Sequence, residues 1–167
     1  IAKKELLPKD IRWHFIGKLQ TNKVKYLVNN VYLIHSLSSI KLLEKIESEF
    51  SKNNSSVNAL IQINIGREES KSGIYEEELE DMIKAIEACN HVKVKGIMVI
   101  IPKGNDEENR YYFSKTKEIF NKLKDRNVKN ISMEILSMGM TNDYKIAIQE
   151  GATMIRVGSG IFGLREK

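Results

Sequence analysis

The sequence predicts an α/β fold, a barrel of parallel strands with helices on its outside, and two observations lead to this prediction. Short runs of β-branched and apolar residues alternate along the chain with longer stretches in which apolar residues recur at helical spacing. Such alternation is typical of βα units around a parallel sheet. The chain has 167 residues, 41% of them hydrophobic and 29% charged, which suits one compact domain over residues 1–167.

Six runs have the composition of buried strands, and residues with useful chemistry follow them. The runs lie at 11–16, 31–37, 59–65, 93–101, 131–138 and 154–157. Glycine, proline or polar residues stand at the carboxyl end of every run, and in a barrel these ends meet at one mouth. An open doubly wound sheet would instead gather its ligand groups at a single switch point. Since the commonest barrel has eight units, we expect a (β/α)8 barrel that lacks about two N-terminal βα units.

Three apolar stripes at helical spacing predict the long helices of these units. Asn105 and Glu108 resemble the capping box that starts the third helix. Shorter helices are expected after Thr21 and Thr141, and the polar segment 51–56 is expected to be a surface loop. The stripes consist of Leu42, Leu43, Ile46 and Phe50, of Leu79, Met82, Ile83 and Ile86, and of Phe113, Thr116, Ile119, Phe120 and Leu123.

Charge and composition exclude some classes of protein. The net charge of +5 and the pI near 9.2 permit anion binding. The lysines are dispersed among glutamates, as on solvated helix faces, so nucleic-acid binding is disfavoured. No run reaches the roughly 18–20 apolar residues of a membrane span. The single Cys89 fits a reducing compartment, so we expect a cytoplasmic protein with the mitochondrion as the alternative, and we expect no metal site.

The last predicted strand carries the most informative residues. Alternation places Ile155 and Val157 on the helix-covered side, so Arg156 points into the barrel. A buried guanidinium needs a partner, which is a phosphate, a ring nitrogen or a carboxylate such as that of Glu134. The following turn, 158–160, offers N–H groups and a hydroxyl to a phosphate, as barrels often do after their last two strands. A tight turn with a structural salt bridge is the alternative.

Three further positions are candidates for a ligand site. Ser137 stands at the end of the preceding strand, where it can donate to the same anion, and Gly139 lets the backbone turn closely there. Taken alone, this segment favours the alternative of a serine–glycine turn followed by a capped helix. His14 either approaches the ligand or is a hydrogen-bonded core histidine. Asn64 either reaches into the mouth or forms an Asx turn before Gly66.

Five segments, in order along the chain, resemble one known family. The first, Trp13-His14-Phe15-Ile16-Gly17 with Leu19-Gln20 and Asn22-Lys23, resembles the WHFIGxLQxNK signature of the pyridoxal phosphate homeostasis proteins, which are related to the N-terminal barrel of alanine racemase. The others lie at 64–73, 96–102, 136–144 and 147–163 with Arg165. The resemblance runs from Leu6 to Arg165, and five motifs in the right order make it highly specific.

The resemblance implies a fold, a cofactor and a function. The fold is the barrel of the alanine racemase N-terminal type, and the cofactor is pyridoxal 5′-phosphate (PLP). The function is the intracellular buffering and delivery of PLP without strong catalytic activity. PLP-dependent apoenzymes are the implied partners, and the complete protein is expected to be a monomer. Arg156 would face the pyridine nitrogen, and Ser137, Gly158 and Ser159 would hold the phosphate. We also count Met138, His14 and Asn64 among the candidate cofactor-binding residues.

An arginine opposite the ring nitrogen has a chemical consequence. A permanently charged donor keeps that nitrogen unprotonated, so the ring is a poorer electron sink. This suits a carrier of the cofactor better than an enzyme of strong carbanion chemistry. An amino-acid racemase is the alternative, although it generally needs a second base on the other face of the substrate carbon. A basic RNA- or protein-binding module is the third candidate function, and an aromatic content of only 7% disfavours it.

A protein of this family bonds PLP through a lysine, which the resemblance places near the end of the first barrel strand, in a segment of the type AVSKTK. No such segment occurs in this sequence, so no catalytic residue is expected in it. From strand counting and the family pattern alike, we expect that two βα units, with this lysine, are missing from the N-terminal side. Lys18, Lys23 and Lys71 follow predicted strand ends, but none is a persuasive substitute. An open six-unit barrel exposes apolar edges, so we expect this polypeptide to be poorly stable or oligomeric.

Overall fold

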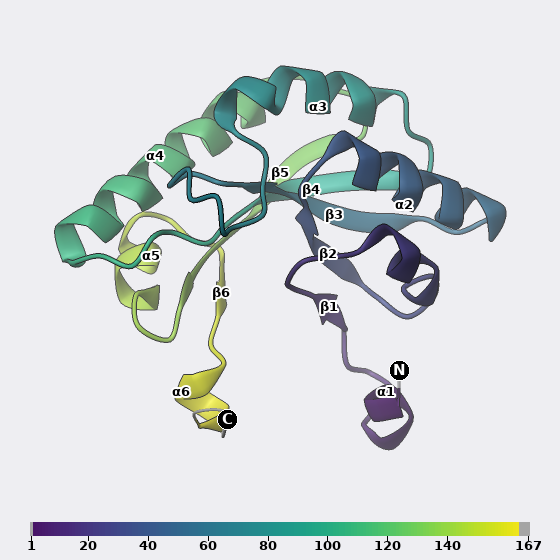
Figure 1. Ribbon diagram of the computed structural model, residues 1–167, viewed down its shortest axis with the longest axis horizontal. Helices are drawn as coiled ribbons and strands as arrows, with labels where there is room; N and C mark the ends of the chain where they lie inside the picture. Colours follow the sequence, from purple (N-terminus) through teal and green to yellow (C-terminus); the bar gives the residue numbers. More distant parts are fainter. Residues whose placement is uncertain (1, 164–167) are drawn as a thin grey trace.

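The computed structural model describes residues 2–163 and consists of six strands joined largely by helical connections (Figure 1). The strands are β1 (His14–Phe15), β2 (Leu33–Leu37), β3 (Val57–Ile63), β4 (Val92–Val99), β5 (Ile131–Met140) and β6 (Met154–Arg156). The α-helices are α1 (Ala2–Leu6), α2 (Ile40–Lys52), α3 (Leu79–Glu87), α4 (Asp106–Lys124), α5 (Tyr144–Gln149) and α6 (Ser159–Phe162). Two 3-10 turns are η1 (Thr21–Tyr26) and η2 (Glu76–Glu78). Arg165, the last residue of the family resemblance, lies outside the described residues.

All neighbouring strands of the sheet are parallel, and their order in space is their order along the chain. A doubly wound sheet would reverse its strand order at a switch point, so this order is that of a (β/α) barrel. Within residues 2–163 no strand pairing joins β1 to β6, and the described sheet is therefore open. The predicted fold class is confirmed as a barrel-like α/β fold with six parallel strands.

Helices α2, α3 and α4 cover one face of the sheet (Figure 1). Each buries the apolar stripe that the sequence predicts, with Ile46, Met82 and Phe113 at most 1% exposed. The capping box of α4 is confirmed, since Asn105 accepts from the N–H of Glu108 and its own N–H donates to the Glu108 carboxylate. The larger hydrophobic core lies between these helices and the sheet. None of the helices within residues 2–163 combines the length and the apolar character that crossing a membrane requires.

The other face of the sheet forms the barrel interior and carries a smaller apolar layer. Leu33, Leu60 and Met98 form this layer, and Ile135 and Met154 pack against it. Side chains alternate along a strand, so the residue two positions further on points into the same interior, closer to the carboxyl end. These residues are His35, Gln62, Ile100, Ser137 and Arg156. The interior therefore changes from apolar to largely polar toward the mouth.

The ends of all six strands differ from the predicted runs by a few residues, and three differences between the elements and the prediction are informative. The strand expected at 11–16 is limited to His14–Phe15, because it has β2 as its one neighbour and pairs with it at two positions. Helix α2 extends to Lys52, two residues into the segment predicted as a loop. Helix α1 has no counterpart in the prediction, and its Leu6 is 85% exposed.

Candidate functional site

Four polar side chains form an interior network at the carboxyl ends of the strands: His14, His35, Ser137 and Arg156. His14 Nδ1 lies 3.0 Å from His35 Nε2, and His35 Nδ1 lies 3.1 Å from Ser137 Oγ. Arg156 donates from Nη1 to Ser137 Oγ over 2.7 Å. The four residues come from β1, β2, β5 and β6, so the sheet alone brings them together. Arg156 points into the interior, as the alternation in β6 predicts.

Both histidines of the interior network are held neutral. Burial, assisted by the neighbouring His14 and Arg156, lowers the pKa of His35 to about 3. Burial and the charge of Arg12 lower the pKa of His14. The interior network therefore carries one positive charge at neutral pH, which sits on Arg156.

The guanidinium of Arg156 is anchored at two points and keeps one donor without a partner. Its Nη2 donates to the main-chain oxygen of Val99 over 2.8 Å, in addition to the bond from Nη1 to the serine. Its Nε is buried and has no hydrogen-bond partner among the residues described. Burial lowers the pKa of Arg156 to about 10, against the opposing charge of Asp143, so the group stays charged at neutral pH.

The alternative in which Arg156 forms a salt bridge with Glu134 is wrong. Glu134 lies 2.9 Å from Lys95 Nζ, and its side chain is 59% exposed. Glu134 precedes Ile135 of the inner layer, so alternation points it away from the interior in which Arg156 lies. The partners of Arg156 are thus a hydroxyl and a carbonyl, both of them neutral.

A second group of polar atoms lies between the loops that follow β5 and β6. We call it the loop donors: Thr141, Ser159 and Gly160. Ser159 Oγ donates to Thr141 Oγ1 over 3.2 Å, and the Gly160 N–H donates to the same oxygen over 3.1 Å. A methyl group placed on the neighbouring Gly158 would meet nothing within 4 Å, so the main chain there borders open space. Hydroxyls and main-chain N–H groups beside open space are a donor set suited to a phosphate.

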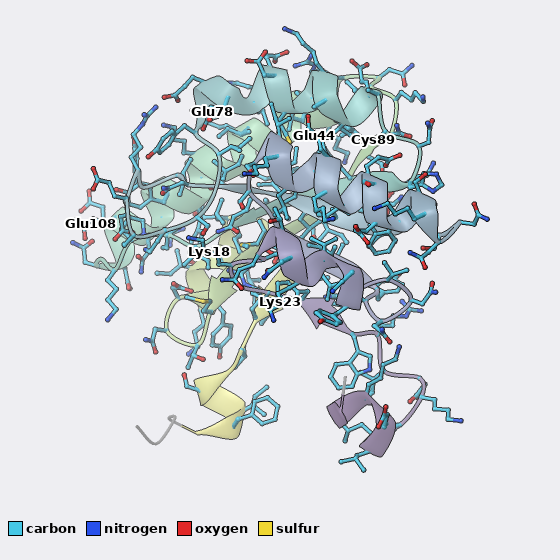
Figure 2. The ribbon with its side chains drawn as sticks, turned by 45° about the vertical axis from the view of Figure 1, so that its right-hand side comes forward. Lys18, Lys23, Glu44, Glu78, Cys89 and Glu108 are labelled. Carbon is cyan, nitrogen blue, oxygen red and sulfur yellow. The ribbon has the colours of Figure 1, made fainter. Side chains whose placement is uncertain are left out.

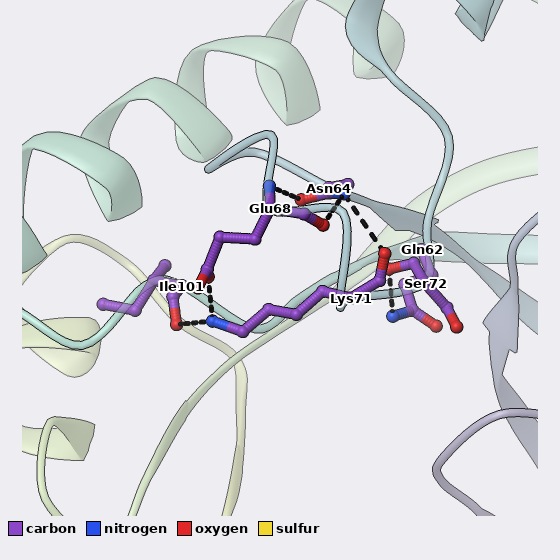
Figure 3. Close-up of polar contacts among 6 residues, drawn as sticks. All are labelled: Gln62, Asn64, Glu68, Lys71, Ser72 and Ile101. Carbon is purple, nitrogen blue, oxygen red and sulfur yellow. Dashed lines mark hydrogen bonds and ion pairs between the residues drawn. The ribbon is translucent and has the colours of Figure 1, made fainter.

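Asn64 organises the loop that follows β3 (Figure 3). Its Nδ2 donates to the main-chain oxygens of Glu68, over 2.9 Å, and of Lys71, over 3.2 Å, while its Oδ1 accepts from the Glu68 N–H over 3.1 Å. Lys71 forms an ion pair with Glu68 and donates to the main-chain oxygen of Ile101 over 2.8 Å. The loop is thereby tied to the segment after β4. The Asn64 side chain thus bonds the loop backbone at Glu68 and Lys71, beyond Gly66. These bonds differ from the Asx turn expected before Gly66, in which the side-chain oxygen accepts from the N–H two residues on.

The residues predicted for the site therefore occupy different surroundings. His14, Ser137 and Arg156 meet in the interior network, where the fully buried Ser137 hydroxyl contacts His35 and Arg156. Gly158 and Ser159 are exposed beside the open space, and Asn64 belongs to its loop, as described above. The side chain of Met138 packs into the core between the sheet and the helices. A role for Met138 at the mouth would accordingly fall to its main chain.

Two parts of this arrangement escape sequence reasoning. His35 belongs to the polar residues expected at the strand ends, but the sequence does not single it out as a site residue, because all five residues of Leu33–Leu37 are buried and no alternation marks the inward side chains. Arg156 also donates to the main-chain oxygen of Val99, a group that every residue type has, so the sequence cannot mark it. The position of Thr141, just after the serine–glycine turn, could have indicated a phosphate ligand. In the sequence-based prediction, Thr141 is only the residue before a short helix.

The lysines near the mouth have other surroundings. Lys18 and Lys23 lie in the segment that follows β1, where Figure 2 labels them. Lys71 is engaged by Glu68 and Ile101. Lys95 lies in the first half of β4, away from the mouth, and contacts Ser132 and Glu134. Within residues 2–163 no lysine forms a hydrogen bond with a member of the interior network.

Comparison with known proteins assigns the chain to a family. The family model of the alanine racemase N-terminal domain matches residues 5–166. The pyridoxal phosphate homeostasis protein of Aquifex aeolicus is 44% identical over 158 residues, which are 94% of this chain and 68% of that protein. The chain belongs to the pyridoxal phosphate homeostasis protein family. Another family member, from Haemophilus influenzae, is 40% identical over 93% of this chain and 66% of its own length, so the chain spans about two thirds of these relatives.

Solved structures agree with this family assignment. The structure of PipY from Synechococcus elongatus without PLP has a TM-score of 0.90 at 31% identity, covering 97% of this chain and 76% of that one. The structure of PipY with PLP bound has a TM-score of 0.84 at 30% identity, covering 97% and 74%. The barrel-like fold of this homeostasis family member is therefore that of PipY over nearly the whole chain.

Proposed function

We propose that this chain binds pyridoxal 5′-phosphate and serves in the homeostasis of that cofactor, as a carrier that buffers it and delivers it to PLP-dependent apoenzymes. One observation carries the proposal: the buried Nε of Arg156 is a charged donor without a partner, at the mouth of a barrel-like fold. The PLP bound to PipY and the names of the curated relatives support this choice of cofactor.

The interior network suits the pyridine ring nitrogen of PLP. A buried donor without a partner destabilises a protein by about 1–3 kcal/mol, and an acceptor nitrogen would remove that penalty. The bonds to Ser137 and Val99 keep the guanidinium from turning away. Its charge holds an acceptor nitrogen in the unprotonated form. Arg156 can therefore both orient the ring and limit its reactivity.

The loop donors suit the phosphate of PLP. The Gly160 N–H and the Ser159 hydroxyl donate to Thr141, so the Thr141 hydrogen is left for a phosphate oxygen, and the Ser159 hydroxyl can rotate toward one. The open space beside Gly158 leaves room for phosphate oxygens close to the backbone. These donors lie in the loops after β5 and β6, the last two strands, where barrels often bind phosphate. Two sets of donors would thus hold the two ends of one molecule.

The chemistry of the network favours a carrier over a racemase. When bound, PLP supplies an aldehyde that bonds reversibly to amines and a ring that accepts electrons. Arg156 weakens the second property, because it keeps the ring nitrogen unprotonated. A racemase also needs bases for two faces of the substrate carbon. In the described part of the chain, the network offers two neutral histidines in contact with each other and no carboxylate.

We also propose that the six units are part of a (β/α)8 barrel of the alanine racemase N-terminal type. On this proposal, residues 1–167 are a single, N-terminally incomplete domain of a protein that is monomeric when complete. The two remaining βα units, with the lysine that bonds PLP, would lie outside the 167 residues. The coverage of 68% and 66% of two relatives supports this, as do the open edges at β1 and β6.

Equilibrium dialysis of the chain against PLP tests the proposed function. We expect one saturable and reversible site, whose affinity for pyridoxal, which lacks the phosphate, is at least about tenfold lower. Arg156→Lys should lower the affinity about tenfold, because lysine cannot reproduce the fixed fork of donors. Arg110→Lys is the matched control, since Arg110 is an exposed residue of α4 that contacts Gln149 and Glu150. Binding that does not saturate, or equal losses in both variants, would contradict the proposal.

A further inference from the structure

One arrangement of protons satisfies the hydrogen-bonding groups of the interior network. Arginine can only donate, so Ser137 Oγ accepts from Arg156. Among the contacts of the fully buried Ser137 hydroxyl, one acceptor remains for its hydrogen, which is His35 Nδ1 at 3.1 Å. His35 must then carry its own proton on Nε2, from which it donates to His14 Nδ1 at 3.0 Å. His14 carries its proton on Nε2 in turn.

In this arrangement the hydrogen bonds of the network all run in one direction: Arg156 donates to Ser137, Ser137 to His35, and His35 to His14. The serine hydroxyl is held in one orientation, because its hydrogen is committed to His35 and its oxygen faces Arg156. A His35 with its proton on Nδ1 would compete with Arg156 as a donor to Ser137 and would leave the serine hydrogen without an acceptor. The tautomer of His35 therefore decides how well Ser137 accepts from Arg156.

We propose that His35 is a positioning residue of the cofactor site. As a neutral acceptor it orients the Ser137 hydroxyl, and Ser137 then fixes the guanidinium of Arg156 toward the ring nitrogen. Ser137 accordingly serves the ring end of the site, and the phosphate is left to the loop donors. The part of this inference that concerns PLP rests on the proposed function, whereas the proton arrangement is a property of the chain alone.

The proton arrangement is tested without cofactor by nitrogen NMR of the histidine rings. The sequence contains three histidines, His14, His35 and His91, so the signals are few enough to assign by substitution. We expect His35 at neutral pH as a neutral ring with its proton on Nε2. A proton on Nδ1, or a charged ring at neutral pH, would overturn the proposal.

The positioning role is tested by two substitutions that each keep one half of the imidazole. The amide of His35→Asn can occupy the position of Nδ1 and accept from Ser137, whereas that of His35→Gln can reach the position of Nε2 and contact His14. We expect His35→Asn to bind PLP within about threefold of the unsubstituted chain and His35→Gln to bind it about tenfold more weakly. A residue that merely fills space would give equal losses in both variants.

A spectroscopic signal distinguishes positioning from a general loss of structure. With PLP labelled with nitrogen-15 in its ring, the bound ring nitrogen should give the same signal in the unsubstituted chain and in His35→Asn, and a shifted one in His35→Gln. Ser137→Ala removes the middle of the network without added bulk and should shift the signal in the same way. His91→Asn is the control, because the His91 ring contacts the main-chain oxygen of Ser55, outside the interior network, and it should change neither affinity nor signal.

The outcomes separate the two proposals. Equal affinities in His35→Asn and His35→Gln, with an unshifted ring signal in Ser137→Ala, would overturn the positioning role while PLP binding stands. An unsubstituted chain that binds no PLP would overturn the proposed function and the positioning role together. The expected pattern supports both.

Discussion

The guanidinium of Arg156 lies 2.7 Å from the hydroxyl of Ser137, although the residues stand on different strands. The parallel register of β5 and β6 creates this contact. Ser137 pairs with Met154, so the side chain two positions after Met154 points into the same interior, one step closer to the mouth. The register thus fixes a cation at the carboxyl end of the barrel interior, between the bulk of the sheet and the loops that follow its last two strands.

Two glycine substitutions should separate binding from stability. Gly158 borders open space and has a φ of −106°, so Gly158→Ala should leave the free energy of unfolding nearly unchanged. Its methyl group would occupy space that we assign to the phosphate, and PLP affinity should fall about tenfold. Urea unfolding and equilibrium dialysis measure the two effects. Unchanged PLP affinity in Gly158→Ala would place the phosphate elsewhere.

Gly96→Ala should give the opposite result. Gly96 has a φ of +152°, and a Cβ there would lie 1.8 Å from the main-chain oxygen of Ile135 on the neighbouring strand. Strands β4 and β5 would have to separate, so we expect a loss of about 3 kcal/mol in the free energy of unfolding. A stability equal to that of Gly158→Ala would show that the register of β4 and β5 described here is incorrect.

The chain should become less stable as the pH falls, in a window set by the pKa of His35. Its pKa is about 3 in the folded chain against 6.5 without burial, so between these values the unfolded chain binds a proton that the folded chain does not. The free energy of unfolding should therefore decrease as the pH falls from 6.5, by at most about 1.4 kcal/mol per pH unit from this residue.

Urea unfolding of the chain and of His35→Asn measures this contribution. The difference between the two slopes is best taken between about pH 6.5 and 5, above the range in which most carboxylates titrate. The slope should be shallower in His35→Asn, because the titrating ring is absent. Parallel pH profiles for the two proteins would rule out a buried, neutral His35.

Asn64→Ala should loosen the loop that follows β3. The amide makes three bonds to the main chain of Glu68 and Lys71 and is only 5% exposed, so its loss should destabilise the fold by about 2–3 kcal/mol. Hydrogen exchange should accelerate at the Glu68 N–H. Asn53→Ala is the matched control, because the exposed Asn53 amide donates to the main-chain oxygen of Glu49, and about 0.5 kcal/mol is expected there. Equal effects in both variants would deny Asn64 its organising role.

The sequence predicts the large-scale features because they depend on local patterns. Period-two and helical spacing locate the strands and helices, and alternation alone turns Arg156 inward. The capping pair of Asn105 and Glu108 is a short-range interaction, and it is present as expected.

Long-range contacts account for what the sequence does not predict. His35 and Ser137 are 102 residues apart in the sequence, and only the folded sheet brings their side chains to 3.1 Å. The partner expected for Arg156 was a charged or ring group, whereas the fold supplies a hydroxyl and a main-chain oxygen. The length of β1 likewise depends on its single neighbour and not on its own composition.

The open edges of the sheet should make this polypeptide associate. Exposed apolar side chains lie close to β1 and β6, among them Ile16, Tyr32 and Phe162, which are 46%, 45% and 85% exposed. Contiguous apolar surface and unpaired strand edges favour self-association. Sedimentation over a hundredfold range of concentration should show a mass that rises with concentration. A monomer at all concentrations with cooperative unfolding would contradict this expectation.

The most direct measurement of the central claim is a PLP titration followed by the backbone and arginine signals of the chain in nitrogen–proton NMR. With PLP, we expect saturable shifts confined to the Arg156 Nε–H, the N–H groups of 158–160 and the N–H of Thr141. Inorganic phosphate should shift the N–H groups of 158–160 and of Thr141 and leave the Arg156 signal unchanged. Shifts that concentrate instead on lysines of the outer helices, or an Arg156 signal that PLP leaves unmoved, would contradict the claim that the barrel interior and the loop donors form one cofactor site.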